Sequence, residues 1–258
     1  IYGKTLDGNK FIQIENQSIT FGIDIFGSCF YMLTLYEEIV KNEYDKWGRF
    51  QCKNSLAFQE NFLCRPIVNE YVEMLWVFIK KLWPDTDRKI RNFRSIITHD
   101  VDLPFSNFNV TIKQVLKGCI GDLIKRKSLG LFFKRVISYA FMTINIEVED
   151  PFDTFDFMMN LLDNKEIRCN FNFIARQKNN SFYDISHPRV LSLIKKIYRK
   201  GHIIGWHPGV GSYDDFERAY DEYYQLLEIC KSIGYEIIPK GGRQHRLQWK
   251  NPITWQIW

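Results

Sequence analysis

In the first third of the chain, the spacing of apolar residues predicts strands followed by helices. Apolar and polar residues alternate over 11–25, as they do in one or two β-strands. Helical spacing follows over 29–40 and again over 66–83, where one proline begins the helix and another ends it. The next segment, 85–94, is charged and typical of a linker. We therefore expect residues 1–93 to form a small α+β domain.

Beyond residue 94, strand and helix patterns alternate. A short β-branched run containing Ile96 and Ile97 predicts a first buried strand. Because the later connections are short, consecutive strands are expected to pair in parallel. An α/β barrel and an open doubly wound sheet both fit this order of elements. The predicted helices span 153–163, 188–200 and 214–232, and the predicted further strands span 169–174, 203–206 and 235–239.

Ionisable residues follow the first of these strands, in the stretch Thr98-His99-Asp100-Val101-Asp102. Side chains alternate along an extended segment, so Asp100 and Asp102 are expected on one side and His99 on the other. Two neighbouring carboxylates repel unless a cation or a shared proton lies between them. That arrangement suits one carboxylate as a metal ligand and the other as a proton acceptor. A turn in which the aspartates cap backbone amides is the alternative.

Two later strand ends carry polar residues that can meet the aspartates. One offers His207, and the other offers Arg243, Gln244 and His245. In α/β folds the carboxyl ends of parallel strands hold the ligand-binding residues. Carboxylate and imidazole groups are suitable ligands for Zn²⁺ or a similar divalent ion. An arginine within reach would hold a neighbouring aspartate ionised.

Composition places the chain among ordinary folded proteins. Its 258 residues are 45% hydrophobic and 25% charged, enough for a packed core. The net charge of +5 is mild, and we expect no nucleic-acid partner because that would require a concentrated basic face. The six cysteines are scattered without a Cys-x-x-Cys pair, as in reduced cytoplasmic proteins.

The two ends of the chain suggest that it belongs to a longer protein. The sequence begins at Ile1 instead of Met, and it stops at Trp258 within a helical pattern that has just begun. It has no signal peptide and no apolar run long enough to span a bilayer, which favours a cytoplasmic location.

The segment 113–142 is basic and amphipathic. Lysine and arginine alternate there with leucine, isoleucine and phenylalanine. Two ordinary helices with solvated basic faces explain this pattern most simply. Contact with an anionic membrane surface is the alternative.

At the strand-end residues the sequence resembles the polysaccharide deacetylases, the NodB-homology domain of carbohydrate esterase family 4. That family's first motif has a catalytic-base aspartate followed closely by a metal-binding aspartate, and Asp100 and Asp102 match it. The stretch 201–205 (Gly-His-Ile-Ile-Gly) resembles the strand before the second motif, and His207 stands where the first metal-binding histidine would be. Arg243 is the candidate for the arginine of the third motif.

The resemblance implies a fold for nearly the whole chain. Residues 94–258 would form a NodB-like distorted (β/α) barrel that is incomplete at its carboxyl end. The stretches 24–27 (Asp-Ile-Phe-Gly) and 65–68 (Arg-Pro-Ile-Val) resemble those of a subgroup with an extra amino-terminal domain. The family's general acid lies in a later motif, which would follow Trp258.

The resemblance also implies an activity and a metal. The protein would be a metal-dependent hydrolase that removes N-acetyl or O-acetyl groups from a carbohydrate. Asp102 and His207 would hold a divalent ion, with zinc favoured by family analogy, and Asp100 would activate the water at that ion. The family's second metal histidine lies four residues after the first, but Gly211 occupies that position.

Three groups remain as candidates for the third ligand: His99, His245 or a water. We assign His99 to the metal, and His245 and Trp206 to the substrate. Arg243 would hold the base in place. The missing histidine favours a rival hypothesis, a carbohydrate-binding or scaffolding homologue that has lost its metal.

Overall fold

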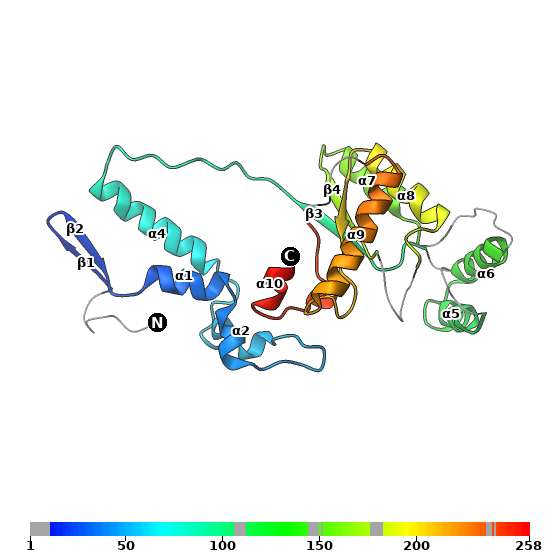
Figure 1. Cartoon of the computed structure of the whole chain (residues 1–258), viewed down its shortest axis with the longest axis horizontal. Coiled ribbons are helices and arrows are strands. Elements are labelled where there is room, and N and C mark those ends of the chain that lie inside the picture. The colour runs from blue at the N-terminus through cyan, green and yellow to red at the C-terminus, as the bar shows by residue number, and fades with distance from the viewer. Residues whose placement is uncertain are drawn as a thin grey trace. The chain divides into compact units, whose positions relative to one another are not determined.

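The computed structural model covers the whole chain and describes residues 11–105, 112–143, 150, 152–175, 183–235, 239 and 241–258. The chain divides into two compact units (Figure 1). The first comprises Ile1–Phe93, Trp249–Gln256 and Trp258, and the second comprises Arg94–Gln248 and Ile257. None of the described helices is both long enough and apolar enough to cross a membrane.

The first unit begins with the predicted strands, which form an antiparallel hairpin. Strand β1 (Ile12–Glu15) pairs with β2 (Ser18–Phe21). The remaining elements are α1 (Ile25–Leu33), α2 (Tyr36–Lys41), the short 3₁₀ turn Cys52–Asn54, α3 (Leu56–Gln59), α4 (Ile67–Leu82) and, near the end of the chain, α10 (Ile253–Ile257) apart from its last residue.

The prediction of a single helix over 29–40 is wrong, because the structure has two helices there, α1 and α2. Leu35 has a left-handed backbone conformation with φ of 54°, and it separates α1 from α2. At the break, the backbone N–H of Glu38 in α2 donates to the carbonyl oxygen of Leu35 at 3.0 Å. The side-chain amide of Asn251 donates to the carbonyl oxygens of Thr34 and Leu35, at 2.9 Å each. Asn251 is distant in sequence, so the spacing of apolar residues over 29–40 could not predict this contact.

The second unit is built on a three-stranded parallel sheet with the order β3-β4-β5. These strands are β3 (Ile97–Val101), β4 (Cys169–Phe173) and β5 (Ile203–Trp206). The helices of the unit are α5 (Ile112–Ile124), α6 (Leu129–Thr143), α7 (Phe155–Asp163), α8 (Pro188–Arg199) and α9 (Phe216–Ser232), and His245–Leu247 forms a 3₁₀ turn. The unit is thus mixed α/β, and within the described residues its sheet does not close into a barrel.

The core of this unit lies between the sheet and helices α7, α8 and α9. Phe171 and Phe173 of the central strand are fully buried, as are Met159 of α7, Ile194 of α8 and Leu226 of α9. A central parallel strand covered on both faces is expected to be largely apolar. Each helix carries one apolar stripe to bury against the sheet. The alternation of helix and strand patterns beyond residue 150 therefore predicted this core correctly.

Two of the predicted strands need comment. Strand β3 does not end at its apolar residues but continues through His99 and Asp100 to Val101, because these residues still pair with β4. The strand predicted over 235–239 lies mainly outside the described residues. After it, Gly242 forms an isolated parallel bridge with Trp206, next to β5.

Candidate metal centre

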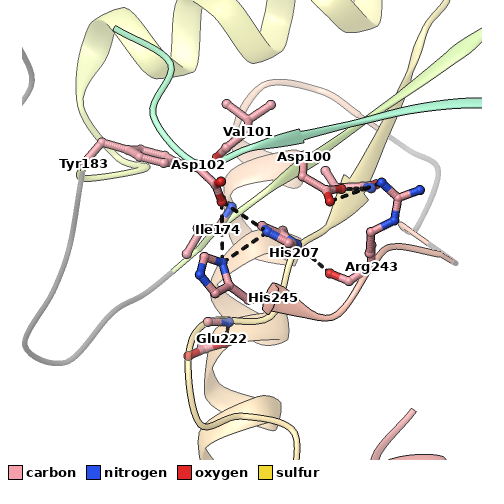
Figure 2. A network of polar contacts seen from close by, with 11 residues as sticks. Asp100, Val101, Asp102, Ile174, Tyr183, His207, Glu222, Arg243 and His245 are labelled. Carbon is pink, nitrogen blue, oxygen red and sulfur yellow. Dashed lines mark hydrogen bonds and ion pairs between the residues drawn. The ribbon is translucent and has the colours of Figure 1, made fainter. Parts of the chain in front are cut away.

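Three side chains from separate segments meet at the carboxyl edge of the sheet. Asp102 directly follows β3, His207 directly follows β5, and His245 begins the 3₁₀ turn. One ligand atom from each residue lies within 4.8 Å of the other two. Both histidines are buried, whereas the Asp102 side chain is 61% exposed. Figure 2 shows the three groups pointing toward one another.

The separations between these atoms are similar. Asp102 Oδ1 lies 3.3 Å from His207 Nε2 and 3.5 Å from His245 Nδ1. The two histidine nitrogens are 3.2 Å apart. Ligand atoms bound at about 2.1 Å to one tetrahedral zinc ion would lie about 3.4 Å from one another. The cluster therefore has the dimensions of one face of such a site.

A contact with the backbone determines the tautomer of His207, and so which ring nitrogen presents a lone pair to the cluster. His207 Nδ1 lies 2.5 Å from the carbonyl oxygen of Arg243 (Figure 2). A carbonyl can only accept, so Nδ1 carries the proton and the neutral ring presents the lone pair of Nε2. That lone pair points at a carboxylate and at a second imidazole. The arrangement is stable with a proton on Nε2 or with a metal cation among the three groups.

Electrostatic effects favour the protonation states that a metal needs in two of these groups. When His207 Nε2 carries a proton in the absence of a metal, its hydrogen bond lowers the pKa of Asp102 below its ordinary value, and the charge of the protonated ring adds to this. Burial lowers the pKa of His245, and the neighbouring His207 lowers it further. Asp102 is thus favoured as a carboxylate and His245 as a neutral imidazole, which are the forms that bind metal.

Asp100 lies beside this cluster and is held by two donors. Arg243 Nη1 donates to Asp100 Oδ2 at 3.2 Å (Figure 2). The Asn172 amide donates to Asp100 Oδ1 at 2.9 Å. Arg243 is itself positioned by Thr98, whose hydroxyl oxygen accepts from Nη2 at 2.6 Å. Each oxygen of Asp100 therefore has one fixed partner.

Glycines make these contacts possible. A Cβ on Gly242 would lie 1.7 Å from the carbonyl oxygen of Trp206, so only glycine allows this approach. The close approach is stabilised by hydrogen bonds from Trp206 N to the Gly241 oxygen at 3.0 Å and from Arg243 N to the Trp206 oxygen at 3.1 Å. Together these contacts bring Arg243 to the edge of the sheet. In the same way, a Cβ on Gly205 would lie 2.0 Å from Asn172 Oδ1.

The cluster opens into a pocket of about 760 Å³. Its lining includes the two aspartates and His207. The other lining residues are Leu103 and the five consecutive residues Arg243, Gln244, His245, Arg246 and Leu247. Arg246 and Leu247 have positive φ values of 56° and 55°. Such conformations are strained for residues with side chains and are often found at binding sites.

Two of the residues assigned from sequence lie elsewhere. The ring of His99 packs against Phe171, with 5.3 Å between centroids, and it is not part of the ligand cluster. Trp206 is only 5% exposed and packs against Tyr223 of α9. His245, which the sequence assigned to substrate, instead lies with the two metal-ligand candidates.

A buried carboxylate organises the loop that follows His207. Glu222 of α9 accepts hydrogen bonds from the backbone N–H of Gly209 at 2.7 Å and from the Ser212 hydroxyl at 2.8 Å. Gly211 lies within this loop and has a φ of +85°. A histidine at that position would be strained. The loop therefore has a backbone that suits glycine, and the third candidate ligand, His245, lies in another segment.

Tyr183 links the two strands next to the cluster. Its hydroxyl accepts from the backbone N–H of Ile174 at 2.8 Å and donates to the carbonyl oxygen of Val101 at 3.1 Å. Val101 directly precedes Asp102, so this buried phenol fixes the backbone that carries a candidate ligand. Sequence reasoning missed Tyr183, Asn172 and Glu222. Only the alternation of asparagine and phenylalanine in β4 was a usable signal.

Comparisons with known proteins bear on the first unit alone. Residues 3–84 match the model of a family described as "Family of unknown function (DUF7033)". No curated protein and no solved structure matches the chain. The matched segment ends before β3, which carries the first residues of the candidate metal centre.

Proposed function

We propose that this protein is a metal-dependent hydrolase that removes an acetyl group from an N-acetylated carbohydrate. The observation that carries the proposal is the Asp102–His207–His245 cluster beside an aspartate held by arginine. The motif resemblance to polysaccharide deacetylases supplies the substrate class. Under this proposal, the second unit is part of a NodB-like barrel.

The donor set supports a divalent metal, with zinc as the leading candidate. Asp102, His207 and His245 would hold it, and one carboxylate with two imidazoles is a ligand set found at catalytic zinc sites. The backbone carbonyl of Arg243 fixes the tautomer of His207, as outer partners of metal-binding histidines do. When bound, the ion would polarise the acetyl carbonyl and make water a stronger nucleophile.

Asp100 would serve as the proton acceptor. It lies in the same pocket as the ligands but is not one of the three clustered groups. Arg243 favours the ionised carboxylate, and Asn172 fixes its orientation. Asp100 would take a proton from the attacking water, and the guanidinium would keep it from turning toward the cluster.

The rival hypothesis is a carbohydrate-binding homologue without metal. Gly211 favours it, because that glycine stands where the polysaccharide deacetylases that the sequence resembles have a metal-binding histidine. The approach of His245 weakens it, because a replacement imidazole is within reach. The two hypotheses differ in metal content, and that difference can be measured directly.

The test combines metal analysis with an activity assay. We expect the purified protein, loaded with zinc and dialysed, to retain about one ion per chain by elemental analysis. We also expect it to release acetate from N-acetylated chito-oligosaccharides. A protein that retains no divalent ion would refute the proposal and favour the binding homologue. Retention of zinc without acetate release from N- or O-acetylated sugars would refute the hydrolase assignment.

A further inference from the structure

The α5–α6 hairpin exposes apolar side chains along both of its helices. In α5 these are Ile112, Leu116, Ile120 and Leu123, each at least 40% exposed. Their spacing of four, four and three residues places them on one face of the helix. In α6, spacings of three and four residues relate Leu129, Phe133, Val136 and Ile137, which are between 41% and 66% exposed.

The side chains that hold the hairpin together are different ones. Val115 and Cys119 of α5 are buried, as is Asp122. The Asp122 carboxylate pairs with Arg135 of α6 at 2.6 Å. The exposed apolar stripes are therefore not the surfaces that join the two helices. An extended exposed apolar surface on a folded protein commonly marks a site of interaction.

The charge of the hairpin is one-sided. Between residues 112 and 143 the sequence has seven basic residues and one acidic residue, a net charge of +6, although the whole chain carries only +5. The one acid is Asp122, which is buried and paired with arginine. The exposed charge of this segment is thus entirely basic. The basic residues are Lys113, Lys117, Lys125, Arg126, Lys127, Lys134 and Arg135.

Helix α4 provides an instructive contrast within the same chain. It too exposes apolar side chains, with Val72 at 51% and Val77 at 62%. However, its two glutamates and two lysines balance, so its net charge is zero. Of these two surfaces, it is the hairpin that combines exposed apolar stripes with a strong positive charge.

We propose that the α5–α6 hairpin binds the surface of an anionic lipid bilayer. Amphipathic helices with apolar residues on one face and lysine or arginine beside them lie in the headgroup region of such membranes. Anionic headgroups complement the basic residues, and the acyl-chain boundary takes up the apolar stripes. A nucleic acid would complement the charge but not eight exposed aliphatic and aromatic side chains.

The direct test is flotation of the whole protein with lipid vesicles. Vesicles of phosphatidylcholine alone are compared with vesicles in which about 30% of the lipid is phosphatidylglycerol. We expect the protein to float with the anionic vesicles, and to do so less at high salt because salt screens the attraction. Failure to bind, or equal binding to neutral vesicles, would overturn the proposal.

Matched variants separate the hairpin from the rest of the chain. Lys113→Gln with Lys117→Gln removes two exposed charges one helical turn apart, and should weaken vesicle binding roughly 30-fold. Lys195→Gln with Arg199→Gln removes an equally spaced, exposed pair on α8 and should leave binding unchanged. If both pairs weaken binding equally, the hairpin is not the binding surface.

The apolar stripes are tested in the same way. Ile120→Ser with Phe133→Ser should weaken binding at least about tenfold. Val77→Ser with Phe157→Ser changes side chains of similar exposure on α4 and α7 and should have little effect. Circular dichroism confirms that each variant is folded. Two other results would overturn the proposal: self-association that the stripe variant abolishes, and binding of duplex DNA in preference to anionic vesicles.

Discussion

Arg243 contacts His207 through its backbone and Asp100 through its side chain. The carbonyl oxygen of Arg243 lies 2.5 Å from His207 Nδ1, and its Nη1 lies 3.2 Å from Asp100 Oδ2. One residue thus orients a metal-ligand candidate and the proposed base. Because the two contacts use different parts of the residue, substitution of the side chain separates them.

Arg243→Ala should reduce turnover while leaving metal binding largely intact. The substitution removes the guanidinium that holds Asp100 but keeps the carbonyl that fixes His207. A misplaced base costs on the order of 100-fold in rate. Steady-state kinetics and zinc titration calorimetry on the same preparations would check this. Loss of zinc affinity in parallel with activity would show that the side chain supports the metal site instead.

The two aspartates should respond differently to substitution. Asp100→Asn keeps the shape of the side chain but cannot accept the proton, so we expect most turnover to be lost and zinc to be retained. Asp102→Ala removes a ligand and should abolish zinc retention, while far-UV circular dichroism stays unchanged. If Asp100→Asn is the variant that loses zinc, the roles of the two residues are the reverse of those proposed.

A third pair of variants distinguishes the candidate histidine ligands. His245→Ala should weaken zinc binding by more than the roughly 10–100-fold that loss of an outer partner costs. His99→Ala should leave zinc affinity nearly unchanged, because the His99 ring packs on Phe171 and not in the cluster. The opposite ranking in a competition titration with a chromophoric chelator would restore His99 as the ligand.

Position 242 should not tolerate a side chain, whereas position 241 should tolerate one. Gly242→Ala places a methyl group on the carbonyl of Trp206, so the segment carrying Arg243 and His245 must move. We expect a loss of about 2 kcal/mol or more in the free energy of unfolding, together with loss of zinc affinity. Gly241→Ala is the control, because a Cβ added at Gly241 would meet no atom within 4 Å. Urea denaturation of both variants would show whether the steric argument holds.

The buried ion pair of the α5–α6 hairpin should make stability depend on pH. The hydrogen bond from Arg135 lowers the pKa of Asp122 below its ordinary value, and Arg126 adds to this. A carboxyl group whose pKa is depressed in the folded protein stabilises the fold at pH values above its unfolded pKa, which is about 3.9 for aspartate. That stabilisation is lost as the pH falls through the lower, folded value.

Asp122→Asn tests this linkage. The difference in unfolding free energy between the parent and the variant should be constant above about pH 5 and shrink below about pH 4. At neutral pH the variant should be destabilised by about 1–3 kcal/mol, because it removes the charged partner of Arg135, whose side chain is largely shielded from solvent. A difference that stays constant down to about pH 2 would contradict the assigned cause.

Local pattern was enough to predict much of the framework of this protein. Apolar spacing predicted the parallel sheet with its covering helices, because each element must bury one stripe or face. The alternation of side chains along an extended strand placed Asp100 and Asp102 on one side of β3. The same alternation placed His99 on the other side, and there its ring lies against Phe171. This alternation was the one signal in the sequence against our assignment of His99 as a metal ligand.

Only the tertiary structure decided which groups complete the candidate site. His245 reaches Asp102 and His207 because the Gly241–Gly242 segment passes close to Trp206, an approach that depends on a missing Cβ. Asn172 reaches Asp100 because the register of β3 on β4 pairs them, and Gly205 leaves the space. These contacts join residues far apart in sequence. Local periodicity carries information about which face a residue occupies, but the path of a distant backbone segment decides which residue it meets there.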